Sequence, residues 1–232
     1  EYLAFGEGRA GLVIGQDGWL YSDEEFDPVV DAQRQLRDNL ALIRGVQRQL
    51  QERDIQLLLA IVPAKTRLYP EHTGSHRPSA LQRSLYPRFH RAVRNAGIAA
   101  PDLLGPLQAA KREAPMFLRT DTHWTPEGAD ITARALSEVV HSAMQLRGEP
   151  QQFVTETVET RSHQGDLTRF LPLAPLFESL MPQADRLQQR ETHAAEGSGD
   201  DLFGDSDLPV TLVGTSYSAN PAWNFAGALR EH

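Results

Sequence analysis

Three residues in this chain could together activate a serine for acyl transfer. Ser216 lies in Gly214-Thr215-Ser216, directly after the apolar residues 210–213. A serine hydroxyl is a weak nucleophile near neutral pH, so it needs an imidazole to accept its proton and usually a carboxylate to orient that imidazole. Asp121 and His123, two residues apart, supply both groups. We therefore predict Ser216 as nucleophile, His123 as general base and Asp121 as the orienting acid.

The elements around these residues favour that interpretation. Residues 210–213 predict a buried strand that ends just before Ser216, and residues 116–118 predict a short strand before the Asp121 loop. Thr125-Pro126 then opens a helix, with Thr as the N-cap and Pro in the first turn. Site residues of α/β sheets gather in such strand-to-helix loops. Taken alone, the Asp-x-His pair could instead only cap this helix.

Strand and helix patterns alternate along the whole chain, which is typical of an α/β fold with a mainly parallel sheet flanked by helices. The expected elements are a small hairpin at 12–21, helices at 31–53, 79–95 and 102–112 and from 126, and strands at 55–62, 98–100, 116–118, 153–158 and 210–213. Residues 165–180 are expected to be irregular, 191–207 to form a flexible surface loop, and Pro221 to begin a closing helix.

Composition narrows the possible partners and chemistry. The 232 residues carry 23 Lys and Arg against 31 Asp and Glu, a net charge of −8, which argues against nucleic acid as a partner. No cysteine is present, so disulfides and thiolate sites are excluded. The histidines show no metal-ligand spacing, and we expect neither a metal nor a cofactor. No apolar stretch is long enough to cross a bilayer, and any signal or anchor is expected to have been removed.

Three further residues are candidates for substrate binding. Trp124, beside the predicted base, could stack on a sugar or form the wall of a pocket. Lys65 follows the expected strand 55–62, at the edge of a sheet where ligands bind, although it could equally be a solvated surface charge. Tyr217 adjoins the predicted nucleophile. An anionic polysaccharide remains compatible with an acidic protein that has local basic groups.

Four strings resemble the alginate O-acetyltransferases of the AlgJ and AlgX type. They are Asp17-Gly18-Trp19-Leu20-Tyr21, Val62-Pro63-Ala64-Lys65, Asp121-Thr122-His123-Trp124-Thr125 and Gly214-Thr215-Ser216-Tyr217-Ser218. The family is SGNH-hydrolase-like, and its Asp-x-His pair precedes the serine, which reverses the usual SGNH order. This sequence has the same reversed order. AlgX-type proteins add a carbohydrate-binding module and cysteines, so the absence of both here favours the AlgJ type.

The resemblance implies a periplasmic enzyme that transfers acetyl groups to hydroxyls of alginate through the same Ser-His-Asp triad. It also implies an acetyl donor relayed by a membrane-bound O-acyltransferase, other acetylation proteins at the inner membrane, and attachment there through a removed signal or anchor. Residues 1–232 are expected to form one catalytic domain. The family continues with further strands after the position of His232, so we expect this domain to be truncated.

Two alternatives remain open at the level of sequence. A carbohydrate acetyl esterase would use the same triad and hand the acetyl group to water, and a polysaccharide-binding scaffold could retain an inherited triad without using it. A second serine, Ser206, lies in Gly204-Asp205-Ser206, the literal G-D-S of many SGNH enzymes. Ser206 precedes the expected strand 210–213 instead of following it, so we predict that it is not the nucleophile.

Overall fold

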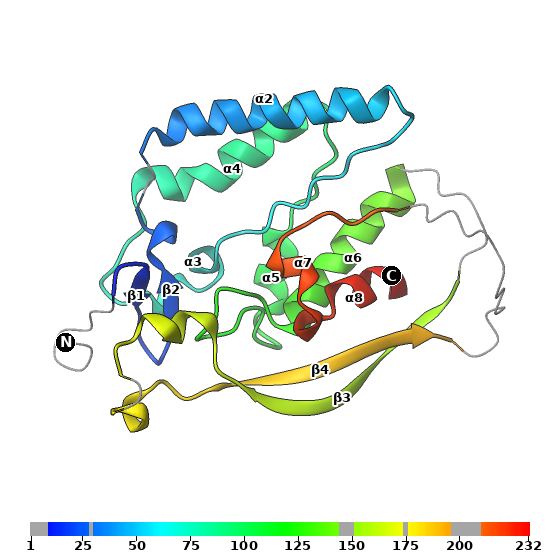
Figure 1. Ribbon diagram of the computed structural model, residues 1–232. Coiled ribbons are helices and arrows are strands. Elements are labelled where there is room, and N and C mark those ends of the chain that lie inside the picture. The colour runs from blue at the N-terminus through cyan, green and yellow to red at the C-terminus, as the bar shows by residue number, and fades with distance from the viewer. Residues whose placement is uncertain (1–8, 28–29, 144–150, 174–175, 196–209) are drawn as a thin grey trace.

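The computed structural model describes residues 9–27, 30–143, 151–173, 176–195 and 210–232 (Figure 1). The α-helices in these ranges are α2 (Ala32–Gln51), α3 (Lys65–Leu68), α4 (Ala80–Asn95), α5 (Leu104–Ala110), α6 (Pro126–Ala143), α7 (Ser216–Ala219) and α8 (Phe225–Glu231). The strands are β1 (Leu12–Ile14), β2 (Leu20–Ser22), β3 (Phe153–His163) and β4 (Asp185–Ala194). Short 3₁₀ turns are η1 (Asp23–Glu25), η2 (Pro70–His72), η3 (Asp166–Phe170), η4 (Glu178–Leu180) and η5 (Pro221–Trp223).

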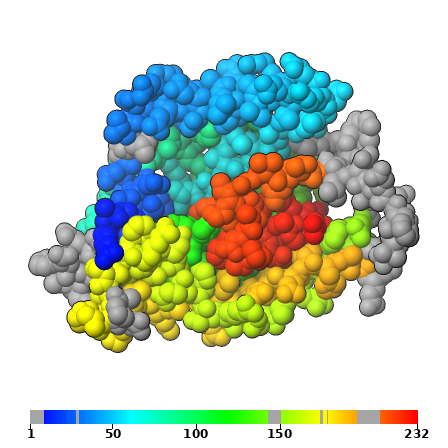
Figure 2. Space-filling view, viewed as in Figure 1, coloured from blue at the N-terminus to red at the C-terminus, as the bar shows by residue number. Residues whose placement is uncertain are grey.

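The elements are arranged in three layers. Helices α2 and α4 pack together along one side, the ribbon of β3 and β4 runs along the opposite side, and α5 to α8 lie between them (Figure 1). Figure 2 shows that residues 210–232, coloured orange to red, occupy the centre of one face of the molecule. The helices in the described ranges are too short or too polar to span a bilayer.

The predicted hairpin and the long helices are confirmed. β1 pairs antiparallel with β2, with Val13 opposite Tyr21. The stripe of α2 places Leu40 and Ile43 against a cluster around Val93 of α4, as its three-to-four-residue spacing requires. Helix α6 begins with the predicted cap, because Thr125 Oγ1 accepts from the amide of Gly128 at 3.1 Å.

The mainly parallel sheet is not observed among the described residues. Residues 55–62 run extended, but their parallel pairing is limited to one bridge between Leu58 and Ala99. Residues 210–213 form no strand and are exposed, with Val213 at 89%. The prediction of a buried strand there is wrong. An apolar run indicates a strand only if another segment supplies its ladder hydrogen bonds, and the sequence pattern does not reveal that partner.

Three other predictions need correction. Strand β3 extends to His163, well past residue 158, and β4 occupies residues 185–194, so the expected surface loop at 191–207 begins inside a strand. Most side chains of this two-stranded ribbon are polar and exposed, so no alternation of apolar residues marks it in the sequence. After Ser216, Pro221 opens the short turn η5, and α8 starts only at Phe225.

Two apolar clusters meet around the loop of residues 116–124. Leu118 and Trp124 belong to a cluster with α6 and α8, while Met116 and Phe117 belong to one with the hairpin and α3. Tyr217 packs against both clusters. Burial of residues on either side of Asp121 therefore fixes the course of this loop.

Candidate active site

Asp121 and His123 lie on a tight loop that is closed at its base by backbone pairing. Phe117 bridges antiparallel to Trp124, and the amide of Leu118 donates to the carbonyl of His123 at 3.1 Å. Within the loop, the amide of His123 donates to Asp121 Oδ1 at 3.0 Å. The two-residue spacing therefore brings the carboxylate beside the imidazole.

Two other carboxylates hold the backbone of this loop. Asp185 of β4 accepts from the amides of Arg119 and Thr120 at 3.1 and 2.9 Å, and from the Thr120 hydroxyl at 2.6 Å. Asp166 of η3 accepts from the amide and hydroxyl of Thr122 at 2.8 and 2.7 Å. Charge-assisted bonds of this kind are stronger than neutral ones, so the loop is held before any substrate arrives.

The loop also packs against Gly165 with no room for a side chain. The amide of Gly165 donates to Thr120 Oγ1 at 3.1 Å. A Cβ added at Gly165 would lie 2.1 Å from the Thr120 carbonyl oxygen. This position therefore requires glycine for close approach.

Lys65, predicted to contact substrate, lies beneath the Asp121 loop instead. Its side chain is 1% exposed, and its Nζ donates to the carbonyls of Leu118, Arg119 and Asp121 at 3.0, 3.2 and 2.7 Å. Burial lowers the pKa of Lys65 to about 8. With its ammonium directed inward, Lys65 supports the loop and is not placed to meet a ligand.

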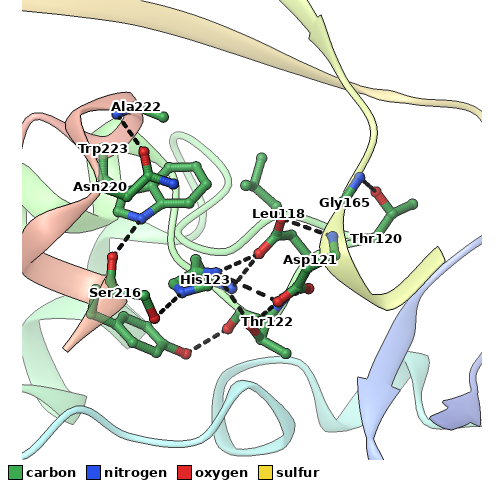
Figure 3. A network of polar contacts seen from close by, with 12 residues as sticks. Leu118, Thr120, Asp121, Thr122, His123, Gly165, Ser216, Asn220, Ala222 and Trp223 are labelled. Atoms are coloured by element: carbon green, nitrogen blue, oxygen red, sulfur yellow. Dashed lines mark hydrogen bonds and ion pairs between the residues drawn. The ribbon is translucent and has the colours of Figure 1, made fainter. Parts of the chain in front are cut away.

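The predicted triad residues form one continuous chain of hydrogen bonds (Figure 3). His123 Nδ1 lies 2.6 Å from Asp121 Oδ1, and His123 Nε2 lies 2.7 Å from Ser216 Oγ. An ionised Asp121 can only accept, so the ring proton belongs on Nδ1, which leaves Nε2 to accept from the serine hydroxyl. Ser216 reaches this position from the first residue of α7, whose N-cap is Thr215.

Asp121 is buried and fully engaged. In addition to the two bonds to His123, its Oδ2 accepts from His163 Nε2 at 2.8 Å and from the amide of Asp166 at 3.0 Å. Burial alone would raise the pKa of Asp121, but the hydrogen bonds from His123, His163 and the two amides hold that pKa well below its usual value. The carboxylate is therefore ionised throughout the physiological range.

Aromatic rings enclose the imidazole of His123. The Trp223 ring stacks on it at 5.1 Å and 23°, and the Trp223 Nε1 donates to the carbonyl of Ser216 at 3.1 Å. The Tyr217 ring lies 4.7 Å from His123, and its hydroxyl donates to the Thr122 carbonyl. These contacts fix the plane of the ring between the carboxylate and the serine.

Comparison with known proteins identifies the family. Residues 12–232 match the family described as "SGNH hydrolase-like domain, acetyltransferase AlgX". The chain belongs to this family. It therefore has an SGNH hydrolase-like fold, even though the described residues pair only in small antiparallel sheets.

Proteins of the AlgJ type are close relatives. The chain is 56% identical to the probable alginate O-acetylase AlgJ of Pseudomonas syringae and 54% identical to that of Pseudomonas aeruginosa, with the whole chain covered in both cases. It spans 60% and 61% of the lengths of these two relatives.

Solved structures agree with this assignment. The O-acetyltransferase domain of Pseudomonas putida AlgJ superposes with a TM-score of 0.87 at 50% identity, over 96% of this chain and 76% of that one. Pseudomonas aeruginosa AlgX superposes with a TM-score of 0.72 at 29% identity, over all of this chain and 54% of that one.

The other predicted substrate contacts within this SGNH-like domain face inward to different degrees. Trp124 is 1% exposed and packs against Tyr217 and Phe225, as the wall of a pocket would. Tyr217 is half-buried, and burial raises the pKa of its hydroxyl. Tyr217 thus keeps some surface beside Ser216, whereas Trp124 offers almost none. Ser206 lies outside the described residues.

Sequence reasoning missed three residues from other elements that contact Asp121 or His123. They are His163, Asp166 and Trp223, which lie 42, 45 and 102 positions after Asp121 in the chain. No local motif spans separations of this length. The sequence offers only weak signals for a role of these residues. Asp166 follows a glycine, and His163 is one of the histidines that lack metal-ligand spacing. Contacts between distant elements cannot be read from local spacing.

Among the described residues, Asp121, His123 and Asp166 are the group that could offer ligand atoms to a metal, with those atoms all within 4.8 Å of one another. Both oxygens of Asp121 already accept hydrogen bonds, and His123 Nδ1 is bonded to Asp121. A cation at this position would therefore compete directly with the hydrogen bond that orients His123.

Proposed function

We propose that this domain transfers acetyl groups to hydroxyls of alginate through an acetyl-serine intermediate. Ser216 is the nucleophile, His123 the general base and Asp121 the orienting acid. The observation that carries the proposal is the unbroken chain of hydrogen bonds from Asp121 through His123 to Ser216. The names of the AlgJ relatives supply the acceptor, alginate.

In the first half of the reaction, Ser216 Oγ attacks the carbonyl carbon of the acetyl donor while its proton passes to His123 Nε2. Asp121 stabilises the imidazolium through Nδ1. The backbone amide of Ser216 has no acceptor within the described residues, so it is free to donate to the developing oxyanion. The proton on Nε2 then passes to the leaving group, and acetyl-Ser216 remains.

In the second half, His123 Nε2 accepts the proton of an incoming hydroxyl, and that oxygen attacks the acetyl carbon. The bond from the carbonyl carbon to Ser216 Oγ breaks, and the proton on Nε2 returns to Oγ. A sugar hydroxyl gives an acetylated polymer, whereas water gives acetate. The two outcomes use the same protein groups and differ in how well the site excludes water.

The test is to incubate the protein with an activated acetyl ester and alginate oligomers, with the Ser216→Ala variant as control. We expect acetylated oligomers by mass spectrometry from the parent and none from the variant. Free acetate without acetylated sugar would instead identify an esterase. Oligomer binding that is equal in parent and variant, without turnover in either, would indicate a scaffold.

The cellular setting is proposed on the resemblance to the family. The domain would act in the periplasm, associated with the inner membrane, and would receive acetyl groups by way of a membrane-bound O-acyltransferase and its partner proteins. Fractionation of cells that express the full-length protein, followed by immunodetection, tests the location. Detection only in the cytoplasm would contradict it.

A further inference from the structure

A second histidine approaches Asp121 from the side opposite His123. His163 is the last residue of β3, and its Nε2 lies 2.8 Å from Asp121 Oδ2, while His123 Nδ1 lies 2.6 Å from Oδ1. The carboxylate of Asp121 thus contacts the imidazoles of His123 and His163, which are 40 positions apart in the chain. The β3–β4 ribbon positions His163, because His163 pairs with Asp185 at the end of this ribbon.

The same indole covers both imidazoles. Trp223 stacks on His123 at 5.1 Å and meets His163 edge to face at 5.6 Å and 80°. Because Trp223 also donates to the carbonyl of Ser216, the nucleophile, the base and His163 share one packing partner. A displacement of His163 would therefore shift Trp223, and through it both His123 and Ser216.

The surroundings of His163 are mainly anionic. The titratable groups that face it are Asp121 and His123 from the loop, Asp166 from η3 and Asp185 from β4, which is itself paired with Arg119. The hydrogen bond to Asp121 raises the pKa of His163, although burial opposes it, and the three carboxylates add to the increase. His163 is thus more cationic near neutral pH than a free imidazole.

We propose that His163 is a positioning residue for acyl transfer: by holding Asp121 Oδ2, it keeps Oδ1 directed at His123. This inference rests on the proposed function of the triad. A carboxylate held at one oxygen can rotate, and rotation would separate Oδ1 from Nδ1. The amide of Asp166 also holds Oδ2, so loss of His163 weakens the orientation without abolishing it.

Three variants separate positioning from simple structural support. His163→Leu removes the donor, whereas His163→Gln keeps an N–H at similar reach but carries no charge. His193→Gln is the matched control, because His193 is exposed on the neighbouring strand of the same ribbon, opposite Val154. Thermal melts of all three accompany the kinetics, so that any unfolded variant is recognised.

On an activated acetyl ester we expect His163→Leu to lower kcat by about ten- to a hundredfold with little change in KM, since misplacement of a reacting group acts on the chemical step. His163→Gln recovers much of that loss. In His163→Gln the acid limb of kcat/KM moves to higher pH, because a cation that competes with the imidazolium of His123 for Asp121 is gone. His193→Gln keeps the kcat and the acid limb of the parent.

An NMR titration of the histidine rings tests the pairing without using turnover. We expect Asp121→Asn to lower the midpoint of the His163 titration, because the hydrogen bond that raises the pKa of His163 is lost, and Ser216→Ala to leave it in place. If the parent shows no Ser216-dependent turnover, the proposed function fails, and this titration alone decides whether His163 and Asp121 are paired. An unchanged midpoint in Asp121→Asn would overturn the inference. So would parent-like kinetics in His163→Leu, or equal losses in the Leu and Gln variants with an unmoved acid limb.

Discussion

The two halves of the proposed catalytic relay are built very differently. The loop of Asp121 and His123 is buried. It accepts hydrogen bonds from Lys65 of α3 and His163 of β3, and it donates hydrogen bonds to carboxylates of β4 and η3. Ser216 lies at the start of a four-residue helix, after residues 210–213 that are exposed and extended. His123 is therefore buried and held by the fold, whereas Ser216 is exposed at the surface.

This difference separates two kinds of mutational effect. Substitutions in the Asp121 loop change both chemistry and stability, because buried polar groups lose their partners. Substitutions at Ser216 change chemistry almost alone. A comparison of activity with the free energy of unfolding, variant by variant, therefore tests whether the two halves really differ in this way.

The largest effect on activity is expected for Ser216→Ala. Loss of the nucleophile should lower turnover of an activated acetyl ester by about a thousandfold or more, with little change in the free energy of unfolding. Ser206→Ala is the control and should keep the parent rate. Similar losses in the two variants would show that Ser216 is not the nucleophile.

Asp121→Asn should lower turnover steeply and also change how stability depends on pH. The pKa of Asp121 is lowered on folding, so the unfolded chain binds its proton first as pH falls. The stabilisation is therefore complete above the unfolded pKa of about 3.9 and is lost as pH falls below it. Urea unfolding of both proteins at several pH values measures this. Parallel acid-side profiles would mean that Asp121 contributes no such linkage.

The hydrogen-bonded arrangement of Asp121, His123 and Ser216 could be predicted from the sequence because its signals are local. Asp-x-His before a helix and Gly-Thr-Ser before another are short motifs whose geometry follows from a few backbone angles. The helices 32–51, 80–95 and 126–143 were likewise predictable, since each has an apolar stripe or a cap.

What could not be predicted depends on distant partners. Residues 55–62 and 210–213 are apolar enough for strands, but a strand forms only where a neighbour completes its hydrogen bonds. The contacts of the Lys65 side chain could not be predicted for the same reason. A lysine after an apolar run is expected to be a surface charge, and its three carbonyl partners come from a distant loop. Of the β3–β4 ribbon, only residues 153–158 were predicted as a strand, because charged residues line both faces of the ribbon.

Lys65→Met tests how much the buried ammonium affects stability. Burial lowers the pKa of Lys65 from 10.5 to about 8, so between these values the unfolded chain holds more protons than the folded one. Stability should therefore rise as pH increases from about 8, by at most on the order of 3 kcal/mol. Lys65→Met should lack this rise. Tyrosines with raised pKa values lower the free energy of unfolding at high pH. They are present in both proteins, so their contribution cancels when the free energies of parent and variant are subtracted. Identical slopes would show that Lys65 does not titrate in this window.

The smallest expected effect comes from a single methyl group at Gly165. Gly165→Ala would place a carbon 2.1 Å from the Thr120 carbonyl oxygen, so the Asp121 loop must shift. We expect a loss of about 1–3 kcal/mol in the free energy of unfolding together with a lower kcat. Gly45→Ala is the matched control: Gly45 lies within α2, and an added Cβ there would meet only the end of Arg48 at 4.0 Å. Alanine favours a helix interior over glycine, so this variant should gain about 0.5–1 kcal/mol and keep the parent kcat. If Gly165→Ala kept the parent kcat despite its loss of stability, the position of the loop would matter less for catalysis than its burial suggests.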